Sequence, residues 1–254
     1  MSTPRRIWLT GASSGIGAAL AESLLKNGDH LALSARHAEP LEALSERFPG
    51  QVLVVAGDLG ERLEVREIGK RIKQAWGALD MALLNAGTCE YIDAAAFDAT
   101  LIERVLRVNL LGTSYCIEAA LPLLRSGNRP HLVGVASAVT YLPLPRAGAY
   151  GASKAGLRYL LESLRLDLAR EGIDVTVINP GFVDTPLTAA NDFPMPQRWS
   201  AEQAAQFICA RLDKHPRDIT FPALFTRVLR LLAHLPTRWQ VGIGKRLARD
   251  GGAQ

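Results

Sequence analysis

Short apolar runs alternate along the chain with longer segments of helical periodicity. The apolar runs are rich in leucine and β-branched residues, which is typical of strands buried on both faces. The segments between them repeat apolar residues every three or four positions, which predicts helices that pack on a sheet. We expect strands near residues 5–10, 30–35, 51–56, 80–85, 131–137, 173–178 and 218–220, and helices near 15–28, 39–48, 61–76, 98–125, 150–171 and 201–213.

This regular alternation predicts the α/β class, with a Rossmann-like, doubly wound parallel sheet and helices on both faces. No repeat or linker interrupts residues 1–254, so we expect a single domain. The least regular part, residues 181–199, is typical of a loop over a site. We interpret residues 181–215 as a substrate loop and its helix, and residues 216–254 as a basic amphipathic segment.

Composition excludes several classes of protein. A chain of 254 residues with 48% hydrophobic content can bury one large core. Because no apolar run reaches about eighteen residues and no secretory segment precedes the first strand, we expect a cytoplasmic protein. The three cysteines, Cys89, Cys116 and Cys209, show no C-x-x-C spacing, so we expect reduced thiols and no metal site.

The formal net charge of +4 is a property of the C-terminal segment. Seven basic and two acidic residues lie between Pro216 and Asp250, so the rest of the chain is close to neutral. A basic stripe over the whole fold would favour nucleic-acid binding, and none is present. We therefore expect no nucleic-acid partner.

A glycine-rich turn follows the first predicted strand. Glycines at positions 11, 15 and 17 allow a tight turn and let backbone N–H groups approach a pyrophosphate at the start of a helix. The spacing G-x-x-x-G-x-G differs from the general G-x-G-x-x-G fingerprint and indicates a subtype of dinucleotide site. The expected cofactor contacts in this turn are Gly11, Ser13, Ser14, Gly15, Ile16 and Gly17.

The sequence T-G-A-S-S-G-I-G over residues 10–17 resembles the short-chain dehydrogenase/reductase family. The resemblance covers about residues 5–185 and implies further cofactor contacts at the ends of later strands. Asp58 would contact the adenine, and Thr185 would meet the nicotinamide carboxamide. The implied contacts after the third, fourth and sixth strands are Asp58 and Leu59, then Asn85, Ala86 and Gly87, then Pro180, Gly181, Val183 and Thr185.

The end of the second predicted strand indicates which dinucleotide is bound. A carboxylate there selects the 2′-hydroxyl of NAD, whereas an arginine accommodates the 2′-phosphate of NADP. Here Ala35 stands in the place of the carboxylate and Arg36 follows it. We expect NADP(H) to be preferred over NAD(H), and only moderately, because Ser14 stands where many NADP-using relatives carry a second base.

Tyr150 and Lys154 form a Tyr-x-x-x-Lys motif on one face of a predicted helix. Ser137 closes the fifth predicted strand, and Asn109 lies in the preceding long helix. The family has these residue types at matching places, so the resemblance implies a catalytic set of Asn109, Ser137, Tyr150 and Lys154.

The chemistry explains why these residue types are needed. Reduction of a carbonyl requires hydride at carbon and a proton at the developing alkoxide, and Tyr150 would be the proton donor. A cation at Lys154 would lower the pKa of the phenol, which is ordinarily about 10. The resemblance implies that Lys154 also contacts the nicotinamide ribose, that Ser137 binds the substrate oxygen, and that Asn109 holds a water linking Lys154 to solvent.

The candidate pocket residues are mostly apolar, which favours a hydrophobic carbonyl or secondary alcohol as substrate. Two other functions stay open, an epimerase or dehydratase of the same fold and a non-catalytic NADP(H) sensor. The family usually forms homodimers or homotetramers, through helices such as 150–171. The pocket candidates are Cys89, Tyr91, Val139, Leu142, Leu144, Phe182, Leu187, Phe193, Met195 and Trp199.

Residues 221–235 predict an amphipathic helix that needs a partner for its apolar face. It could fold over the active site, pack in a homo-oligomer, or lie on an anionic membrane with Trp239 at the interface. The apolar positions are Leu224, Phe225, Val228, Leu229, Leu231, Leu232 and Leu235, and the polar positions are Arg227, Arg230 and His234.

Overall fold

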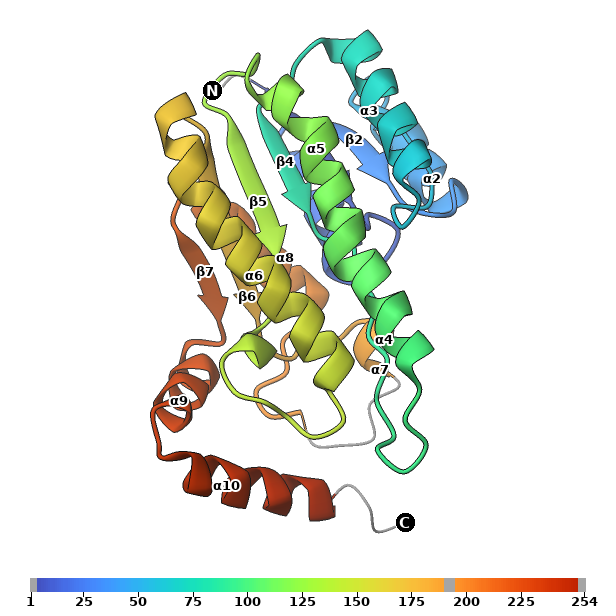
Figure 1. Cartoon of the computed structure of the whole chain (residues 1–254). Coiled ribbons are helices and arrows are strands. Elements are labelled where there is room, and N and C mark those ends of the chain that lie inside the picture. The colour runs from blue at the N-terminus through green and yellow to red at the C-terminus, as the bar shows by residue number, and fades with distance from the viewer. Residues whose placement is uncertain (1–3, 190–194, 251–254) are drawn as a thin grey trace.

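The computed structural model describes residues 4–189 and 195–250, which form a sheet between two layers of helices (Figure 1). The strands are β1 (Arg6–Thr10), β2 (His30–Ser34), β3 (Val52–Val54), β4 (Met81–Leu84), β5 (His131–Val135), β6 (Asp174–Pro180) and β7 (Asp218–Phe221). The α-helices are α1 (Gly15–Lys26), α2 (Glu39–Arg47), α3 (Arg62–Trp76), α4 (Ala99–Leu106), α5 (Thr113–Leu124), α6 (Gly148–Leu168), α7 (Pro186–Ala189), α8 (Ala201–Leu212), α9 (Ala223–Ala233) and α10 (Thr237–Asp250). Shorter turns are the π-helix η1 (Arg107–Gly112) and the 3₁₀ turns η2 (Ala138–Thr140) and η3 (Ala169–Glu171).

The sheet has the order β3-β2-β1-β4-β5-β6-β7, and every pairing is parallel. Along the chain, the strands from β1 to β3 are added on one side and those from β4 to β7 on the other, so the direction of winding reverses between β1 and β4. Leu9 of β1 lies opposite Leu33 of β2 and Leu83 of β4. This is the doubly wound α/β fold that the alternating pattern predicts. Ligands of such sheets bind in the crevice where the order reverses, beyond the carboxyl ends of the strands.

Two apolar layers, one on each face of the sheet, form the core. On one face α1 packs against α8, with Leu20, Leu24 and Ile208 fully buried. On the other face α3 and α5 pack against each other, with Ile72 and Leu124 fully buried. Burial of this kind stabilises each layer by roughly 1.5–3 kcal/mol per large apolar side chain.

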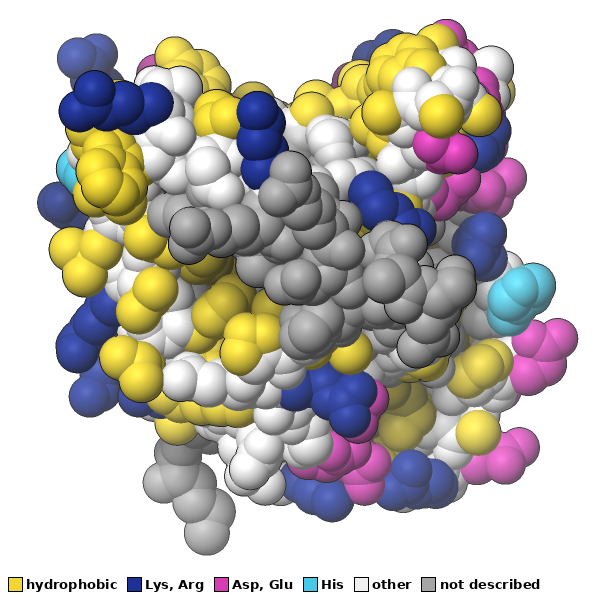
Figure 2. Space-filling view, turned by 90° about the horizontal axis from the view of Figure 1, so that it is seen from below, with side chains coloured by type: hydrophobic (Ala, Val, Ile, Leu, Met, Phe, Trp, Pro, Cys, Tyr) yellow, Lys and Arg dark blue, Asp and Glu magenta, His cyan; other side chains and the backbone are white. Residues whose placement is uncertain are grey.

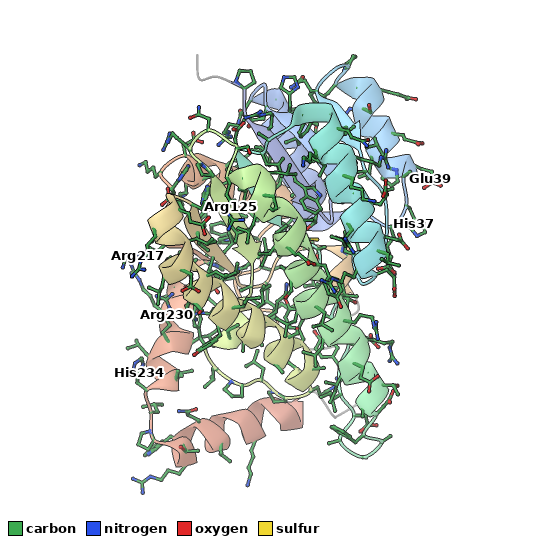
Figure 3. The ribbon with its side chains drawn as sticks, turned by 45° about the horizontal axis from the view of Figure 1, so that its top comes forward. His37, Glu39, Arg125, Arg217, Arg230 and His234 are labelled. Atoms are coloured by element: carbon green, nitrogen blue, oxygen red, sulfur yellow. The ribbon has the colours of Figure 1, made fainter. Side chains whose placement is uncertain are left out.

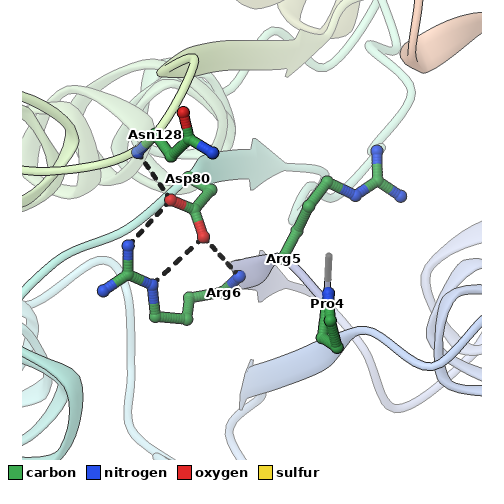
Figure 4. A pocket seen from close by; sticks show the side chains of 5 residues that line it. All are labelled: Pro4, Arg5, Arg6, Asp80 and Asn128. Atoms are coloured by element: carbon green, nitrogen blue, oxygen red, sulfur yellow. Dashed lines mark hydrogen bonds and ion pairs between the residues drawn. The ribbon is translucent and has the colours of Figure 1, made fainter. Parts of the chain in front are cut away.

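The amino ends of the central strands are held by ion pairs far from the crevice (Figure 4). The carboxylate of Asp80 accepts hydrogen bonds from the Arg6 guanidinium at 2.8 Å and from the backbone amides of Arg6 and Asn128 at 2.8 and 2.7 Å. Burial alone would raise the pKa of Asp80, but these bonds hold it below its ordinary value. The residues that line the small pocket at this end therefore have a structural role, because they hold the strands together.

The prediction of one continuous helix over residues 98–125 is wrong in one respect. The structure divides it into α4, η1 and α5, because one turn at Arg107–Gly112 has π-helical hydrogen bonding. A π turn inserts an extra residue into a helix and occurs often at functional sites. No helix in the described part of the chain is long and apolar enough to cross a membrane.

Candidate active site

The carboxyl ends of β1, β4, β5 and β6 bring the expected site residues to one edge of the sheet. The glycine turn follows β1, Asn85 follows β4, Ser137 follows β5, and Gly181 follows β6. Since these strands are adjacent and parallel, segments that are distant in sequence meet at this edge.

The glycine turn has a backbone that side chains would obstruct. Gly11 and Gly15 adopt positive φ angles of 68° and 53°, which L-residues rarely adopt. A Cβ on Gly17 would overlap the Gly11 carbonyl and lie 2.6 Å from Asn85 Nδ2. Ser14 is the N-cap of α1, and its side chain makes no capping hydrogen bond. The first amides of α1 are therefore available to an anion.

Asn85 holds this turn in place. Its Nδ2 donates to the backbone carbonyls of Thr10 and Gly11, both at 3.2 Å. The hydroxyl oxygen of Thr10 accepts from the backbone amides of Asn85 at 3.0 Å and Ala86 at 3.1 Å. The side chain of Asn85 therefore acts on the protein, and a direct contact with a cofactor stays a prediction.

Arg36 and Asp58 lie in the loops after β2 and β3, apart from the catalytic set. Arg36 is exposed and follows the buried Ala35, and no salt bridge joins it to another described residue. Asp58 is tied to its own loop, since its Oδ1 accepts from Gly60 N at 2.8 Å. The side chain of Leu59 packs in the core, so only its backbone can face a ligand.

Ser137 and Tyr150 are in direct contact. The hydroxyl of Ser137 hydrogen-bonds the phenol of Tyr150, and Ser137 Oγ also accepts from Val139 N at 3.2 Å. Because the Val139 amide occupies an acceptor position of the hydroxyl, the Ser137 proton can point to the phenol or to a substrate oxygen.

Burial raises the pKa of Tyr150 to about 12, although the Ser137 hydrogen bond acts in the opposite direction. The lowered pKa that we expect from a neighbouring cation is therefore not found with the charges of the protein alone. Burial removes water from the phenolate, and this desolvation penalty exceeds the stabilisation that the Ser137 hydrogen bond supplies.

Lys154 lies one helical turn after Tyr150, with its side chain buried in α6. Its Nζ donates to the carbonyl of Val135 at 2.8 Å and lies 5.9 Å from the centroid of the Tyr150 ring. Burial lowers the pKa of Lys154 to about 8, with a nearby thiol at Cys89 opposing this shift. The ammonium thus lies between the end of β5 and the phenol.

Asn109 is fully buried in the π turn η1 and joins two parts of the site. Its Oδ1 accepts from Thr88 N at 2.7 Å, and its Nδ2 donates to Thr88 O and to Ser153 Oγ, both at 2.9 Å. Ser153 directly precedes Lys154, so Asn109 links the loop after β4 to the catalytic helix. The role of holding a water stays a prediction.

The loop after β6 reaches the glycine turn. Gly181 N donates to Phe221 O at 2.7 Å, and the buried Val183 bridges to Trp199. A Cβ on Gly15 would lie 2.9 Å from the methyl carbon of Thr185. Thr185 is therefore in contact range of the phosphate-binding turn. Pro180 ends β6 opposite Phe221, and Ile16 packs against the core.

The candidate pocket residues fall into two groups. Cys89 hydrogen-bonds Tyr91 and lies close enough to Tyr150 and Lys154 to influence their pKa values. Trp199, in contrast, stacks on Phe221 at 5.0 Å and belongs to the core. The buried Leu142 packs under α9, the exposed Leu187 lies in α7, and Val139, Leu144, Phe182 and Met195 are half-buried, whereas Phe193 lies outside the described residues.

The arrangement matches a known family. A family model described as short chain dehydrogenase matches residues 5–194. The chain belongs to the short-chain dehydrogenase family. A curated relative of this dehydrogenase from Myxococcus xanthus, named only as an uncharacterized oxidoreductase, is 32% identical over 234 residues, which cover 90% of the chain and 92% of the relative. The protein is accordingly an oxidoreductase of this family.

Solved structures share the fold of this dehydrogenase. A short-chain dehydrogenase from Streptomyces avermitilis superposes with a TM-score of 0.83 at 22% identity and covers 98% of this chain and 99% of its own. An alcohol dehydrogenase from Thermococcus sibiricus in complex with 5-hydroxy-NADP has a TM-score of 0.77 at 24% identity, with coverages of 86% and 95%. A family member from Burkholderia phymatum in complex with NAD has a TM-score of 0.81 at 21% identity, with coverages of 90% and 92%.

Several residues that support the site of this dehydrogenase are not among those expected from the sequence. Thr10 and Ser153 supply the hydroxyls that bind Asn85 and Asn109. Tyr141 lies between two guanidinium groups, 5.0 Å from that of Arg158 and 4.6 Å from that of Arg230. Thr10 and Ser153 lie inside the T-G-A-S-S-G-I-G and Tyr-x-x-x-Lys motifs, so the sequence marks their positions but not their hydrogen bonds. Nothing in the sequence brings Arg230 to Tyr141.

Proposed function

We propose that the protein is an NADP(H)-dependent oxidoreductase that transfers hydride between nicotinamide and an apolar carbonyl or secondary alcohol. The observation that carries this proposal is the contact of the Ser137 hydroxyl with the Tyr150 phenol, with the Lys154 ammonium one helical turn away. A proton donor, a hydrogen-bond donor and a cation together are what carbonyl reduction requires.

A dinucleotide fits the residues present. The backbone at Gly11, Gly15 and Gly17 forms a turn in which any Cβ would lie within 3.0 Å of a neighbouring atom, at the start of α1. The turn residues Ser13 to Gly17 would hold the pyrophosphate, and Thr185 would lie beside the nicotinamide. When bound, the cofactor supplies the hydride and the positive ring charge of its oxidised state.

The residues of the chain then handle the proton. In reduction, Ser137 donates a hydrogen bond to the carbonyl oxygen and Tyr150 transfers its phenolic proton to that oxygen as hydride reaches the carbon. The products are the alcohol and a phenolate, which the Lys154 ammonium stabilises. Asn109 keeps the catalytic helix in register through Ser153. A water held by Asn109 would return the proton from solvent.

Arg36 supports the preference for NADP(H). Its guanidinium is exposed beside Ala35 at the end of β2, where it can meet a 2′-phosphate. The structural relatives in complex with 5-hydroxy-NADP and with NAD make both dinucleotides reasonable for this fold. The absence of a carboxylate at position 35 favours NADP(H).

Self-association through α6 completes the proposal. Tyr159 and Leu166 are strongly exposed on this helix and lie seven positions apart, on one face. A homodimer or homotetramer would bury them. Sedimentation velocity of the wild type and of Leu166→Gln measures this, and a monomeric wild type contradicts it.

The test of the reaction uses NADPH that carries deuterium in both positions at C4, with a panel of aldehydes, ketones and quinones. We expect deuterium on the former carbonyl carbon of at least one product. If the protein binds NADPH tightly but transfers no deuterium to any member of the panel, a cofactor-sensing function replaces this proposal.

A further inference from the structure

Helix α9 carries apolar residues on two sides. Phe225, Leu229 and Leu232 face inward and pack against Ala138 and Leu142, in the segment that follows Ser137. Arg230 strengthens this contact, since it donates a 2.8 Å hydrogen bond to the hydroxyl of Tyr141. Packing against the protein therefore accounts for one side of the helix only.

The other side of α9 is exposed, and α10 adds further exposed apolar residues. Six of the twelve large hydrophobic residues that are exposed in the described part of the chain lie between positions 224 and 241, so the exposure is concentrated here. We call these six residues the outer stripe: Leu224, Val228, Leu231, Leu235, Trp239 and Val241.

The two helices are joined by a defined corner. The side chain of Gln240 in α10 donates to the carbonyls of Ala233 at 3.0 Å and Leu235 at 2.8 Å, at the end of α9. Figure 1 shows α10 running across the end of the molecule beyond the carboxyl ends of the strands. The outer stripe therefore lies on two helices that are hydrogen-bonded to each other.

The charged residues of the segment that carries the outer stripe are of one sign. No acidic residue lies between Asp218 and Asp250, whereas six basic residues do. Arg227, Arg238 and Lys245 are exposed among them. Figure 2 shows hydrophobic side chains beside Lys and Arg side chains on this end of the molecule, and Figure 3 shows Arg217, Arg230 and His234 along the side that carries α9.

We propose that the outer stripe docks the protein on an anionic lipid bilayer. An apolar face with a tryptophan and flanking bases is the pattern of a helix that lies in a membrane interface. A second copy of the chain fits less well, because a two-fold interface would bring the same bases against each other. Anionic headgroups complement the bases, and the acyl chains beneath them can cover the apolar face. The proposal does not depend on the reaction.

Vesicle flotation tests the proposal on the full chain. The probes are vesicles of phosphatidylcholine with phosphatidylglycerol in a roughly 7:3 ratio, and vesicles of phosphatidylcholine alone. We expect the wild type to float with the anionic vesicles at low salt, and at least tenfold less with the neutral ones. A wild type that stays at the bottom with both kinds of vesicle overturns the proposal.

Paired variants separate docking through the outer stripe from nonspecific hydrophobic binding. Leu231→Gln changes a residue of the outer stripe that is 70% exposed, and the control Leu63→Gln changes one on α3 that is 77% exposed. We expect the first to weaken binding to anionic vesicles about tenfold and the second to leave it unchanged. Arg227→Gln with Arg238→Gln should weaken binding by more than tenfold at low salt. Equal binding by Leu231→Gln and wild type contradicts the proposal.

The rival occupant gives a different result. If the outer stripe is an interface between copies, Leu231→Gln lowers the mass of the protein in sedimentation velocity without lipid, and that outcome also overturns the proposal. We expect its mass to match that of the wild type, and its melting temperature to stay within a few degrees, because Leu231 is exposed.

Discussion

The ammonium nitrogen of Lys154 lies 3.2 Å from the point that a Cβ on residue 87 would occupy. The side-chain oxygen of Asn109 lies at the same distance from that point. Gly87 therefore leaves the space in which two members of the expected catalytic set meet. The third residue of the Asn85-Ala86-Gly87 motif thus has a steric role that its sequence position alone does not reveal.

Substitution Gly87→Ala should disturb this meeting point. The added methyl carbon would lie closer to Lys154 Nζ and Asn109 Oδ1 than side-chain atoms ordinarily lie to a Cβ, so one of the two must move. We therefore expect kcat/KM for carbonyl reduction to fall about tenfold or more. Gly151→Ala is the matched control, because its Cβ would meet Val139 at an ordinary 3.9 Å. Equal losses in both variants would show that any methyl group near the site is harmful and would contradict the specific role of Gly87.

The charge of Lys154 should appear in the pH profile of alcohol oxidation. Oxidation needs the Tyr150 phenolate, whose formation is opposed by desolvation, which raises the pKa of this phenol to about 12. A neighbouring cation lowers that pKa, so the loss of the cation raises it. We expect Lys154→Met to move the rising limb of kcat/KM to higher pH by at least about one unit. An unchanged limb with a lower plateau would assign Lys154 to cofactor binding alone.

Cofactor preference should follow the end of β2. Ala35→Asp with Arg36→Leu restores a carboxylate for a 2′-hydroxyl and removes the cation for a 2′-phosphate. We expect the ratio of kcat/KM for NADPH to that for NADH to fall by about a hundredfold, since each charge contact with phosphate contributes roughly 1.5–3 kcal/mol. Arg71→Leu, an exposed arginine on α3, is the control. An unchanged ratio in the double variant removes Arg36 from this role.

Acid should destabilise the fold through His131. This side chain is fully buried and is hydrogen-bonded through Nε2 to Thr176 Oγ1 at 2.7 Å. Its ring stacks on that of His215, with the ring centroids 4.0 Å apart. Burial lowers the pKa of His131 from 6.5 to about 3. The unfolded chain therefore binds a proton below pH 6.5 that the folded chain refuses, and stability falls from there down to about pH 3 by roughly 1.4 kcal/mol per pH unit.

Chemical denaturation at several pH values measures this slope. The slope of stability against pH should be smaller in His131→Gln, because one proton fewer is taken up on unfolding. His37→Gln, at an exposed position, should keep the slope of the wild type. An identical slope in His131→Gln and wild type would show that other groups control the acid limb.

Local signals in the sequence predict most of the fold and the positions of the site residues. The glycine turn depends on backbone conformations that only glycine adopts easily, so Gly11 and Gly15 are visible without a structure. Ser137 and Asn85 could be placed because strand ends follow from apolar runs. Parallel pairing then brings these ends together without any long-range information.

Tertiary effects explain what the sequence could not predict. The π turn around Asn109 adds one residue inside a helix and leaves the apolar repeat almost unchanged, so residues 98–125 resemble one helix. The direction of the Tyr150 pKa depends on burial, which no local pattern reports. Leu231 and Leu232 are identical in type, yet only the packing of α9 shows that Leu232 faces inward.

Tyr150 supplies the proton in the proposed carbonyl reduction, and the substitution Tyr150→Phe removes that proton donor alone. The variant keeps the ring and its packing but lacks the hydroxyl that Ser137 binds. NADPH binding, followed by fluorescence titration, should stay within about threefold of the wild type, while kcat for the best carbonyl substrate should fall by at least a factor of about a hundred. Reduction by Tyr150→Phe at the rate of the wild type would show that Tyr150 is not the proton donor.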